Sequence, residues 1–263
     1  IHNYGKLCIE MRNCVFDKSR TSNGDKNSDD DANHYGRGGA WQCGDYFDGS
    51  TLTTSITDNT EPTFINCNFT NNIGNNGGSL SLYLHNPILF QSCRFENNTA
   101  TMDGGAIHSP PDISVSAAFS SLIFSIEDCT FLNNTSQYTS YDDPKIGNAI
   151  HINGAKCMID NCHFCDNFCN NQKFSTISLT DSPQEVLVNT IIEFTNISNS
   201  CCSLYLRDAE NKRSLFANIT NVTFIRCRYQ PSDSDSNSEK QSNAIYMETG
   251  DSLYLDRCQF HNC

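Results

Sequence analysis

Apolar residues are scarce in this chain. They account for 37% of its 263 residues, too few for the thick globular core that a chain of this length usually builds. No apolar run approaches the roughly 18 to 20 residues of a membrane-spanning helix. Residues 1–4 lack the basic and apolar character of a signal peptide. We therefore expect a mature chain or an excised segment, without a membrane span in this part.

Positive charge is also scarce. The sequence contains 17 Lys and Arg residues against 30 Asp and Glu residues, a formal net charge of −13. A chain with this balance repels nucleic-acid phosphates and anionic lipid headgroups. We therefore expect neither nucleic acid nor a membrane surface as a partner.

Paired Cys-x-x-Cys zinc motifs are absent, although the chain contains 15 cysteines. So many cysteines in a chain of this size favour an oxidising, secretory environment. We expect a secreted, extracellular or cell-surface protein. Because the count is odd, at least one thiol is free or bonded to another chain.

A repeat organises most of what the sequence does contain. One phrase recurs: an apolar residue, two further residues, a cysteine, any residue and an aromatic residue. Its copies are Met11–Cys14–Phe16, Phe64–Cys67–Phe69, Phe90–Cys93–Phe95, Ile126–Cys129–Phe131, Ile159–Cys162–Phe164, Phe224–Cys227–Tyr229 and Leu255–Cys258–Phe260. An eighth copy without cysteine is expected at Ile192–Thr195–Ile197. Between the copies lies a second phrase of small residues followed by an apolar residue, such as Gly104–Gly105–Ala106–Ile107.

Apolar residues alternate with period two within each repeat, as in Leu80, Leu82 and Leu84, which is the signal of a β-strand. Short strands at a repeat of about 26 residues plus insertions predict stacked coils that bury their inward residues only against their neighbours. We expect an all-β fold, a right-handed parallel β-helix (solenoid) of about eight coils with three short strands per coil. It forms a single domain over residues 1–263, a segment of a longer repeat array. Insertions are expected at the corners near residues 17–37, 43–61, 110–121, 136–146 and 229–241.

Two motifs resemble those of a known family. Gly104–Gly105–Ala106–Ile107 matches a Gly-Gly-Ala-Ile motif, and a Phe-x-x-Asn motif occurs at Phe69–Asn72, Phe95–Asn98, Phe131–Asn134 and Phe164–Asn167. Together they resemble the repeat pair of the polymorphic membrane proteins of chlamydiae and of similar surface proteins in parasitic protists. The resemblance implies a pectin-lyase-like, right-handed β-helical segment that is exposed on a surface and takes part in adhesion.

The cysteines fall into two groups. Cys14, Cys67, Cys93, Cys129, Cys162, Cys227 and Cys258 share one inward position, so we expect an internal ladder of small buried side chains. Cys165, Cys169, Cys201 and Cys202 lie at corresponding corners of neighbouring coils. We expect one or two disulfides among these four, next to the copy that has Thr195 in place of cysteine.

Acidic residues and histidines provide the candidates for chemistry. Glu127, Asp160 and Glu193 are expected on one edge of successive coils, where they bind Ca²⁺, act as an acid and a nucleophile on a sugar, or form a solvated polar corner. No other cofactor is expected. His108 and His151 are expected at the same outward position of neighbouring coils. Two ligands make only a weak metal site unless an insertion supplies a third.

Asn-x-Ser/Thr acceptors for glycans occur at Asn68, Asn97, Asn133, Asn134, Asn196, Asn218 and Asn221. Several are expected on outward strand positions or corners, where a glycan attaches in a eukaryotic secreted protein.

No catalytic constellation accompanies these motifs, so the sequence favours a structural or adhesive protein that is not an enzyme and contacts a protein or glycan at a cell surface. Two alternatives remain. One is a carbohydrate-active enzyme or carbohydrate-binding module. The other is a filament subunit that stacks end to end on copies of itself, because the last coil is unfinished at Cys263.

Overall fold

The computed structural model of the chain describes thirteen stretches: residues 2–3, 10–20, 38–43, 62–82, 87–109, 123–137, 147–169, 175–180, 184–193, 202–207, 216–227, 244–247 and 252–263. These stretches form strands, bends and turns, and no helix occurs among them. Consequently no helix in the described stretches is long and apolar enough to cross a membrane.

The strands form three sheets of eight strands and one sheet of four. Sheet A contains, in spatial order, β1 (His2–Asn3), β4 (Trp41–Cys43), β8 (Leu80–Leu82), β12 (Ile107–Ser109), β16 (Gly147–Asn153), β20 (Ser175–Thr180), β23 (Cys202–Arg207) and β26 (Ile245–Met247). Sheet B contains β2 (Glu10–Arg12), β5 (Thr63–Ile65), β9 (Ile88–Gln91), β13 (Ile123–Glu127), β17 (Lys156–Asp160), β21 (Gln184–Val188), β24 (Phe216–Thr220) and β27 (Ser252–Asp256).

Sheet C contains β3 (Val15–Asp17), β6 (Asn68–Thr70), β10 (Arg94–Glu96), β14 (Thr130–Leu132), β18 (His163–Cys165), β22 (Ile191–Glu193), β25 (Thr223–Ile225) and β28 (Gln259–His261). Sheet D contains β7 (Ile73–Asn76), β11 (Thr99–Asp103), β15 (Thr135–Ser136) and β19 (Phe168–Cys169).

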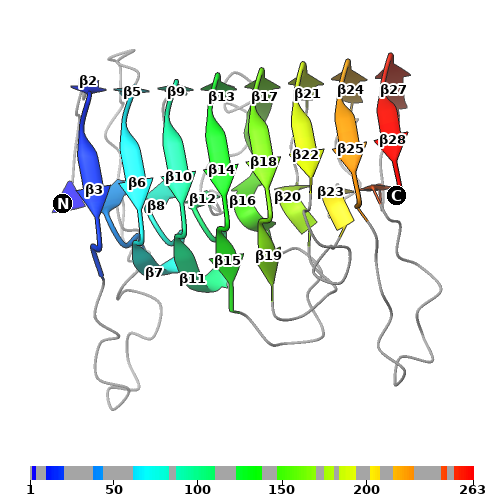
Figure 1. Cartoon of the computed structure of the whole chain (residues 1–263). Coiled ribbons are helices and arrows are strands. Elements are labelled where there is room, and N and C mark those ends of the chain that lie inside the picture. The colour runs from blue at the N-terminus through cyan, green and yellow to red at the C-terminus, as the bar shows by residue number, and fades with distance from the viewer. Residues whose placement is uncertain are drawn as a thin grey trace, which may run out of the picture.

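Neighbouring strands in every sheet are parallel and follow one another in chain order. The chain runs through sheets B and C, in part through D, then through A before it returns to B, and we call one such passage a round. Successive rounds lie side by side from one end of the molecule to the other (Figure 1). The all-β class and the parallel pairing are therefore confirmed, and sheet D is an addition that the sequence did not predict.

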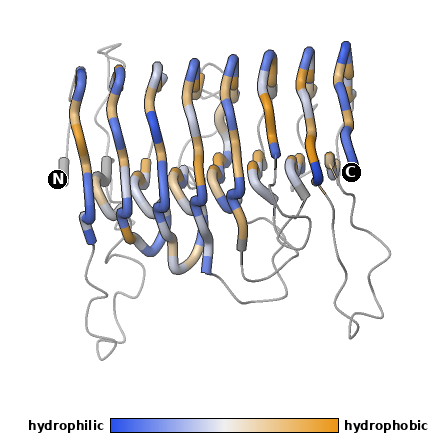
Figure 2. The backbone as a smooth tube through the Cα atoms, viewed as in Figure 1, coloured by the Kyte–Doolittle hydropathy of each residue, from blue (hydrophilic) through white to orange (hydrophobic). Residues whose placement is uncertain are grey.

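Residues with positive φ form the bends of every round. One set precedes sheet C, and it consists of Asn13, Asn66, Ser92, Asp128, Asn161, Asn189, Asn221 and Arg257. A second set follows sheet C, and it consists of Lys18, Asn71, Asn97, Asn133, Asp166, Arg226 and Asn262. Asn and Asp tolerate this left-handed conformation better than other non-glycine residues, which explains why the corners are rich in them. Figure 2 shows the hydrophilic residues gathering at these bends.

Aromatic rings stack along the interior. Phe16, Phe69, Phe95, Phe131 and Phe164 follow one another in nearly parallel planes. Their ring centroids are 4.6 to 4.8 Å apart, which is the spacing of adjacent parallel strands. The inward positions of β3, β6, β10, β14 and β18 in sheet C therefore form a continuous column of rings.

Two repeat copies lie in a different register from the predicted one. The structure pairs Phe164 with Ile192 and Ile159 with Leu187, so the copy without cysteine is Leu187–Thr190–Ile192 and not Ile192–Thr195–Ile197. Thr190 takes the place of the cysteine, because its hydroxyl accepts a hydrogen bond from the Cys162 amide at 3.4 Å.

The copy that contains Cys227 is displaced as well. Phe224 pairs with Ile192 and Phe260, so it belongs to the aromatic column rather than to the apolar position before the cysteine. Cys227 comes three residues after this ring. It therefore takes the place that Asn167 has three residues after Phe164, and it is not part of the cysteine ladder.

Most of the predicted insertions lie outside the described residues. The exceptions are residues 17–20, 43 and 136–137 at their edges. Within these, Asp17, Cys43 and Ser136 belong to the strands β3, β4 and β15 and not to insertions.

Candidate functional site

Two histidines from neighbouring strands meet on the outer face of sheet A. His108 on β12 pairs with His151 on β16, as their spacing in the sequence predicts, and their ring centroids are 5.4 Å apart. Because side chains alternate along a strand, both rings point away from the core that Ile107 and Ile150 enter. Both histidines are nevertheless buried, as are their neighbours along β12 and β16 up to Ile152.

Asp103 supplies a carboxylate to this histidine pair from the end of β11. Its Oδ2 atom is in direct contact with Nδ1 of His151 and lies 3.9 Å from Nε2 of His108. Its other oxygen, Oδ1, accepts hydrogen bonds from the backbone N–H groups of Gly104 at 2.7 Å and Gly147 at 3.1 Å. One carboxylate oxygen is thus fixed by the backbone, and the other is directed at both imidazoles.

The electrostatics of the cluster favour an ionised carboxylate. Burial raises the pKa of Asp103, but the charge and hydrogen bond of His151, the charge of His108 and the Gly147 amide together hold this pKa below its ordinary value. A charge this sheltered from water is stable only when it is paired. Asp103 is therefore an anion whose partners are two histidines and two amides.

His151 is held from its other side as well. Its Nε2 atom lies 3.3 Å from the hydroxyl of Thr180 on β20, the next strand of sheet A. A proton on Nδ1 is donated to the Asp103 carboxylate, so Nε2 accepts a hydrogen bond from the Thr180 hydroxyl. Asp103, His108 and His151, with ligand atoms within 4.8 Å of one another, can together hold a cation or relay a proton.

A second cluster lies on the outer face of sheet C. His163 and Cys165 are on β18, and Glu193 is on the adjacent β22. His163 Nε2 and Glu193 Oε1 are 2.8 Å apart, and the three ligand atoms lie within 4.8 Å of one another. Burial, together with the negative charges of Asp166 and Glu193, raises the pKa of Cys165 to about 12. The thiol is therefore protonated at neutral pH.

The predicted column of three carboxylates is wrong. Glu127 and Asp160 do pair on β13 and β17, but the next residue in their column is Val188. Glu193 lies on sheet C, opposite Cys165. The difference has the same origin as the misplaced repeat copy, because a frame centred on Thr195 places Glu193 on sheet B, whereas the frame centred on Thr190 places it on sheet C.

Glu127 and Asp160, which lie opposite each other on neighbouring strands, already accept hydrogen bonds from other side chains. Glu127 accepts a hydrogen bond from the Ser125 hydroxyl at 2.9 Å, and Asp160 accepts one from the Asn189 amide at 2.9 Å. No third acidic side chain comes next to them in the described part of their column. The calcium site predicted from three carboxylates therefore loses its basis.

Six of the seven ladder cysteines occupy one inward column: Cys14, Cys67, Cys93, Cys129, Cys162 and Cys258. All six carry free thiols. Their sulfurs also donate hydrogen bonds to backbone carbonyls, as Cys93 does to Phe64 at 3.3 Å and to Gln91 at 3.4 Å. The column therefore fills space and satisfies the carbonyls of the bend, which the sequence did not predict.

The predicted disulfides receive no support from Cys165, which is a half-buried free thiol. Cys201 lies outside the described residues, and only the backbones of Cys169 and Cys202 are described, in β19 and β23. Pairing of these last three cysteines stays a prediction.

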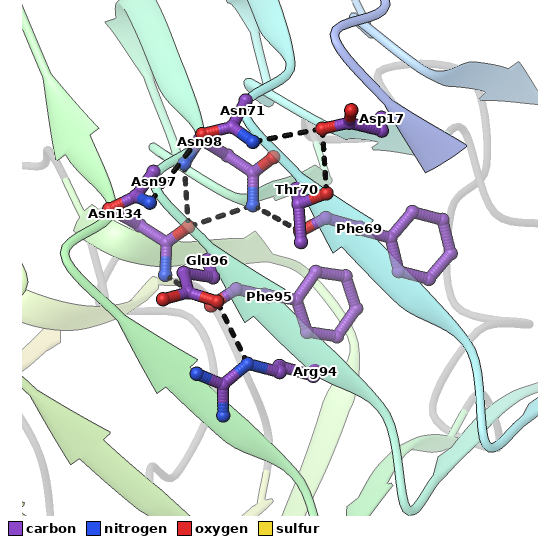
Figure 3. A network of polar contacts seen from close by, with 10 residues as sticks. All are labelled: Asp17, Phe69, Thr70, Asn71, Arg94, Phe95, Glu96, Asn97, Asn98 and Asn134. Atoms are coloured by element: carbon purple, nitrogen blue, oxygen red, sulfur yellow. Dashed lines mark hydrogen bonds and ion pairs between the residues drawn. The ribbon is translucent and has the colours of Figure 1, made fainter. Parts of the chain in front are cut away.

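Asn134 does not fit the prediction that it accepts a glycan. It is 0% exposed, and its amide donates hydrogen bonds to the Phe95 carbonyl at 3.0 Å and to Asn167 Oδ1 at 2.9 Å. The asparagines of successive Phe-x-x-Asn motifs are linked in the same way, so that Asn72, Asn98, Asn134 and Asn167 make a buried ladder. Figure 3 shows its two central members, Asn98 and Asn134. An amide nitrogen used in this way is closed to a glycan in the folded chain.

The other acceptors lie nearer the surface. Asn68, Asn97, Asn133 and Asn221 are exposed, and Asn218 is half-buried. Asn196 lies outside the described residues. Glycosylation of these five described positions stays a prediction.

Asp103 is the functional candidate that the sequence reasoning missed. The sequence predicts that a third ligand for the histidines would come from an insertion, whereas Asp103 is in the same round as His108 and directly precedes Gly104. Gly104 has a φ of 63°, and this bend brings the end of β11 beside β12. The signal in the sequence was an acidic residue placed immediately before the Gly104–Gly105 turn.

Comparison with protein-family models, curated proteins and solved structures finds no match to this chain. The resemblance to surface repeat proteins therefore rests on the two motifs alone.

Proposed function

We propose that the chain is a right-handed parallel β-helix of about eight coils that acts as a binding scaffold at a cell surface or outside the cell. The parallel pairing of consecutive rounds supports a solenoid, and right-handed crossovers are strongly preferred between parallel strands. Like the polymorphic membrane proteins that its motifs resemble, it would use this rod for adhesion to a protein or a glycan.

The observation that carries the proposal is the contrast between inward and outward positions in sheet C. The inward column is nearly uniform, and it contains Phe69, Phe95, Phe131, Phe164, Ile192 and Phe224. The adjacent outward column contains Thr70, Glu96, Leu132, Cys165, Glu193 and Ile225. A constant interior with a non-repeating outer surface is typical of solenoids that present extended binding faces.

Sheet C is an open face of this scaffold, in contrast to sheet A. Its outward residues are exposed or half-buried along β6, β10, β14, β18, β22 and β25, whereas several strands of sheet A are buried on both faces. The recognition surface would therefore lie on sheet C, with sheet B beside it.

Binding of the fluorescently labelled chain to a glycan array and to cultured cells tests this function. We expect saturable binding to at least one glycan or cell type, with no change in glycan mass. Arg94→Ala with Glu96→Ala, which removes a half-buried ion pair of 2.9 Å on sheet C, should weaken binding at least tenfold. The matched pair Glu127→Ala with Asp160→Ala on sheet B should retain it.

Two outcomes contradict the proposal. Release of shortened sugars that is lost in the Glu127→Ala and Asp160→Ala chain would identify a carbohydrate-active enzyme instead. Absence of saturable binding to glycans and cells, for a chain that gives the β-sheet circular dichroism of the folded state, would show that the chain is not an adhesive scaffold.

A further inference from the structure

We propose that Asp103, His108 and His151 form a binding site for one divalent transition-metal ion of the zinc class on the outer face of sheet A. This inference does not depend on the proposed adhesive function. It rests on ligand chemistry, on the geometry of the three side chains and on their burial.

The donor set fits this class of ion. Two imidazole nitrogens and one carboxylate oxygen are typical ligands of Zn²⁺ and of related ions such as Co²⁺, whereas Ca²⁺ and Mg²⁺ prefer sites made of oxygen atoms. Three protein ligands leave a fourth position for water or another molecule. The site would therefore hold an ion with one accessible coordination position.

The distances are close to those that an ion requires. Zinc ligands lie about 2.0 to 2.2 Å from the metal, so two ligand atoms on one ion are at most about 4.2 Å apart. Asp103 Oδ2 and His108 Nε2 are 3.9 Å apart, and all three ligand atoms lie within 4.8 Å of one another. Side-chain movements of less than about 1 Å would place the three atoms around one ion.

His108 favours a metal over a simple ion pair. The contact between Asp103 and His151 would by itself satisfy a buried carboxylate. The second imidazole is also directed at the same oxygen, but at 3.9 Å, which is too long for a hydrogen bond. Two nitrogens that converge on one carboxylate oxygen supply three donor atoms for one ion, and the contact between Asp103 and His151 would open to admit it.

The surrounding contacts orient the ligands in advance. The Gly104 and Gly147 amides hold Oδ1 of Asp103, and Thr180 contacts Nε2 of His151. Metal-binding histidines and carboxylates are ordinarily fixed in this way by hydrogen bonds from their other polar atom. The arrangement thus leaves Oδ2 of Asp103 and Nδ1 of His151 for the ion.

Burial strengthens the case. The side chains of His108, His151 and Asp103 are 9%, 7% and 16% exposed. With neutral histidines the cluster carries one net negative charge, which a divalent ion compensates in a poorly hydrated environment. The cluster of His163, Cys165 and Glu193 is different, since its His163 and Glu193 side chains are 40% and 28% exposed. It therefore serves as an internal control.

The test uses the full chain without a histidine tag, freed of metal by a chelator and titrated with Co²⁺ and then with Zn²⁺. We expect one ion per chain, a Co²⁺ absorption spectrum of tetrahedral nitrogen and oxygen ligation, and displacement of Co²⁺ by Zn²⁺. His108→Asn, His151→Asn and Asp103→Asn should each weaken binding at least a hundredfold. The matched His163→Asn variant should bind as the unchanged chain does.

Other results would overturn the assignment. A sulfur-to-cobalt charge-transfer band, or loss of binding on His163→Asn, would move the site to the cluster of His163, Cys165 and Glu193. A folded chain that binds no ion would show that Asp103 and His151 form only a structural pair. Should the variants unfold, thermal denaturation of the unchanged chain decides, because an ion that binds the native state must raise the melting temperature.

Discussion

Neighbouring asparagines have different roles in this chain, and the difference is set by which way each side chain points. Asn98 is buried and accepts hydrogen bonds from the backbone and side-chain amides of Asn72, both at 3.0 Å. Its own amide donates to the Phe69 carbonyl and to Asn134, both at 2.9 Å (Figure 3). Asn97 is exposed and has a φ of 54°, so its role is to adopt the backbone conformation of the bend and not to pack in the interior.

Asn98→Ala should therefore lower the free energy of unfolding by about 3 kcal/mol or more, since it leaves buried amide and carbonyl groups without partners. Asn97→Gly is the matched control, and it should change the same quantity by less than about 1 kcal/mol because glycine adopts positive φ readily. Urea denaturation followed by circular dichroism measures both. Equal effects of the two substitutions would show that the buried ladder adds nothing beyond the bend.

Cysteines likewise differ by position. Burial raises the pKa of Cys67 to about 11, whereas hydrogen bonds from the side chain and then the backbone of Cys227 lower the pKa of Cys263 to about 6, against the effect of burial. A thiol reacts through its thiolate. At neutral pH, Cys263 should consequently be the more reactive of the two by a wide margin.

Alkylation by iodoacetamide, followed residue by residue with mass spectrometry between about pH 5 and about pH 9, tests this prediction. The rate at Cys263 should level off above about pH 7, and the rate at Cys67 should still be rising at the upper end. Cys227→Ala removes the thiol donor and should move the midpoint for Cys263 to higher pH. A midpoint for Cys263 above about pH 8 in the unchanged chain would contradict the assignment.

At the scale of the strands, one turn between sheets D and A depends on close contact between backbones. A Cβ atom on Gly105 would lie 1.9 Å from the Asn148 carbonyl oxygen and 2.7 Å from the Thr135 amide nitrogen. Both atoms belong to the backbone of the next round and cannot yield as a flexible side chain would. The glycine is thus required by the spacing of rounds.

Gly105→Ala should cost about 3 kcal/mol or more in unfolding free energy, because it forces neighbouring rounds apart. It should also weaken metal binding, since Asp103 and His108 flank this turn. Gly154→Ala provides the control: its Cβ would meet nothing within 4 Å, and only its φ of 82° opposes alanine, at about 1 kcal/mol. A Gly105→Ala chain as stable as Gly154→Ala would contradict the close approach.

The strands themselves could be predicted from the sequence, whereas the register of two rounds could not. Period-two alternation and the Phe-x-x-Asn motif define the strands wherever cysteine and phenylalanine are present. Thr190, Ile192 and Val222 stand where other rounds have cysteine or phenylalanine. Without those two residues, the repeat pattern can be aligned with the neighbouring copies in more than one way. Only pairing with the preceding round selects the right frame. The histidine pair was predictable from matching positions in the repeat, but Asp103 was not, because its position depends on the backbone turn at Gly104.

At the scale of the whole molecule, the interior columns are not uniform along the stack. From Phe16 to Phe164 the aromatic column is unbroken. The round of β22 has Ile192 in place of the ring and Thr190 in place of the cysteine, and the next round has Val222 in the cysteine column. Stacked rounds are stabilised mainly by their neighbours, so these two rounds separate the uniform part of the stack, up to β18, from the single round of β27 and β28.

Amide hydrogen exchange should therefore be faster in β22 and β25 than in β10 and β14. All four strands have equivalent backbone hydrogen bonds, but local opening depends on local packing rather than on the number of hydrogen bonds. Phe95→Ala tests the cause. Removal of this ring costs about 3 to 5 kcal/mol in a packed core, and it should raise exchange in β10 and its two neighbours towards the rate of β22 while leaving β25 unchanged. Two results would contradict this prediction: equal protection from exchange along sheet C, or an effect of Phe95→Ala that spreads evenly over all rounds. Either would mean that the molecule opens as one cooperative unit and that the substituted rounds do not weaken it.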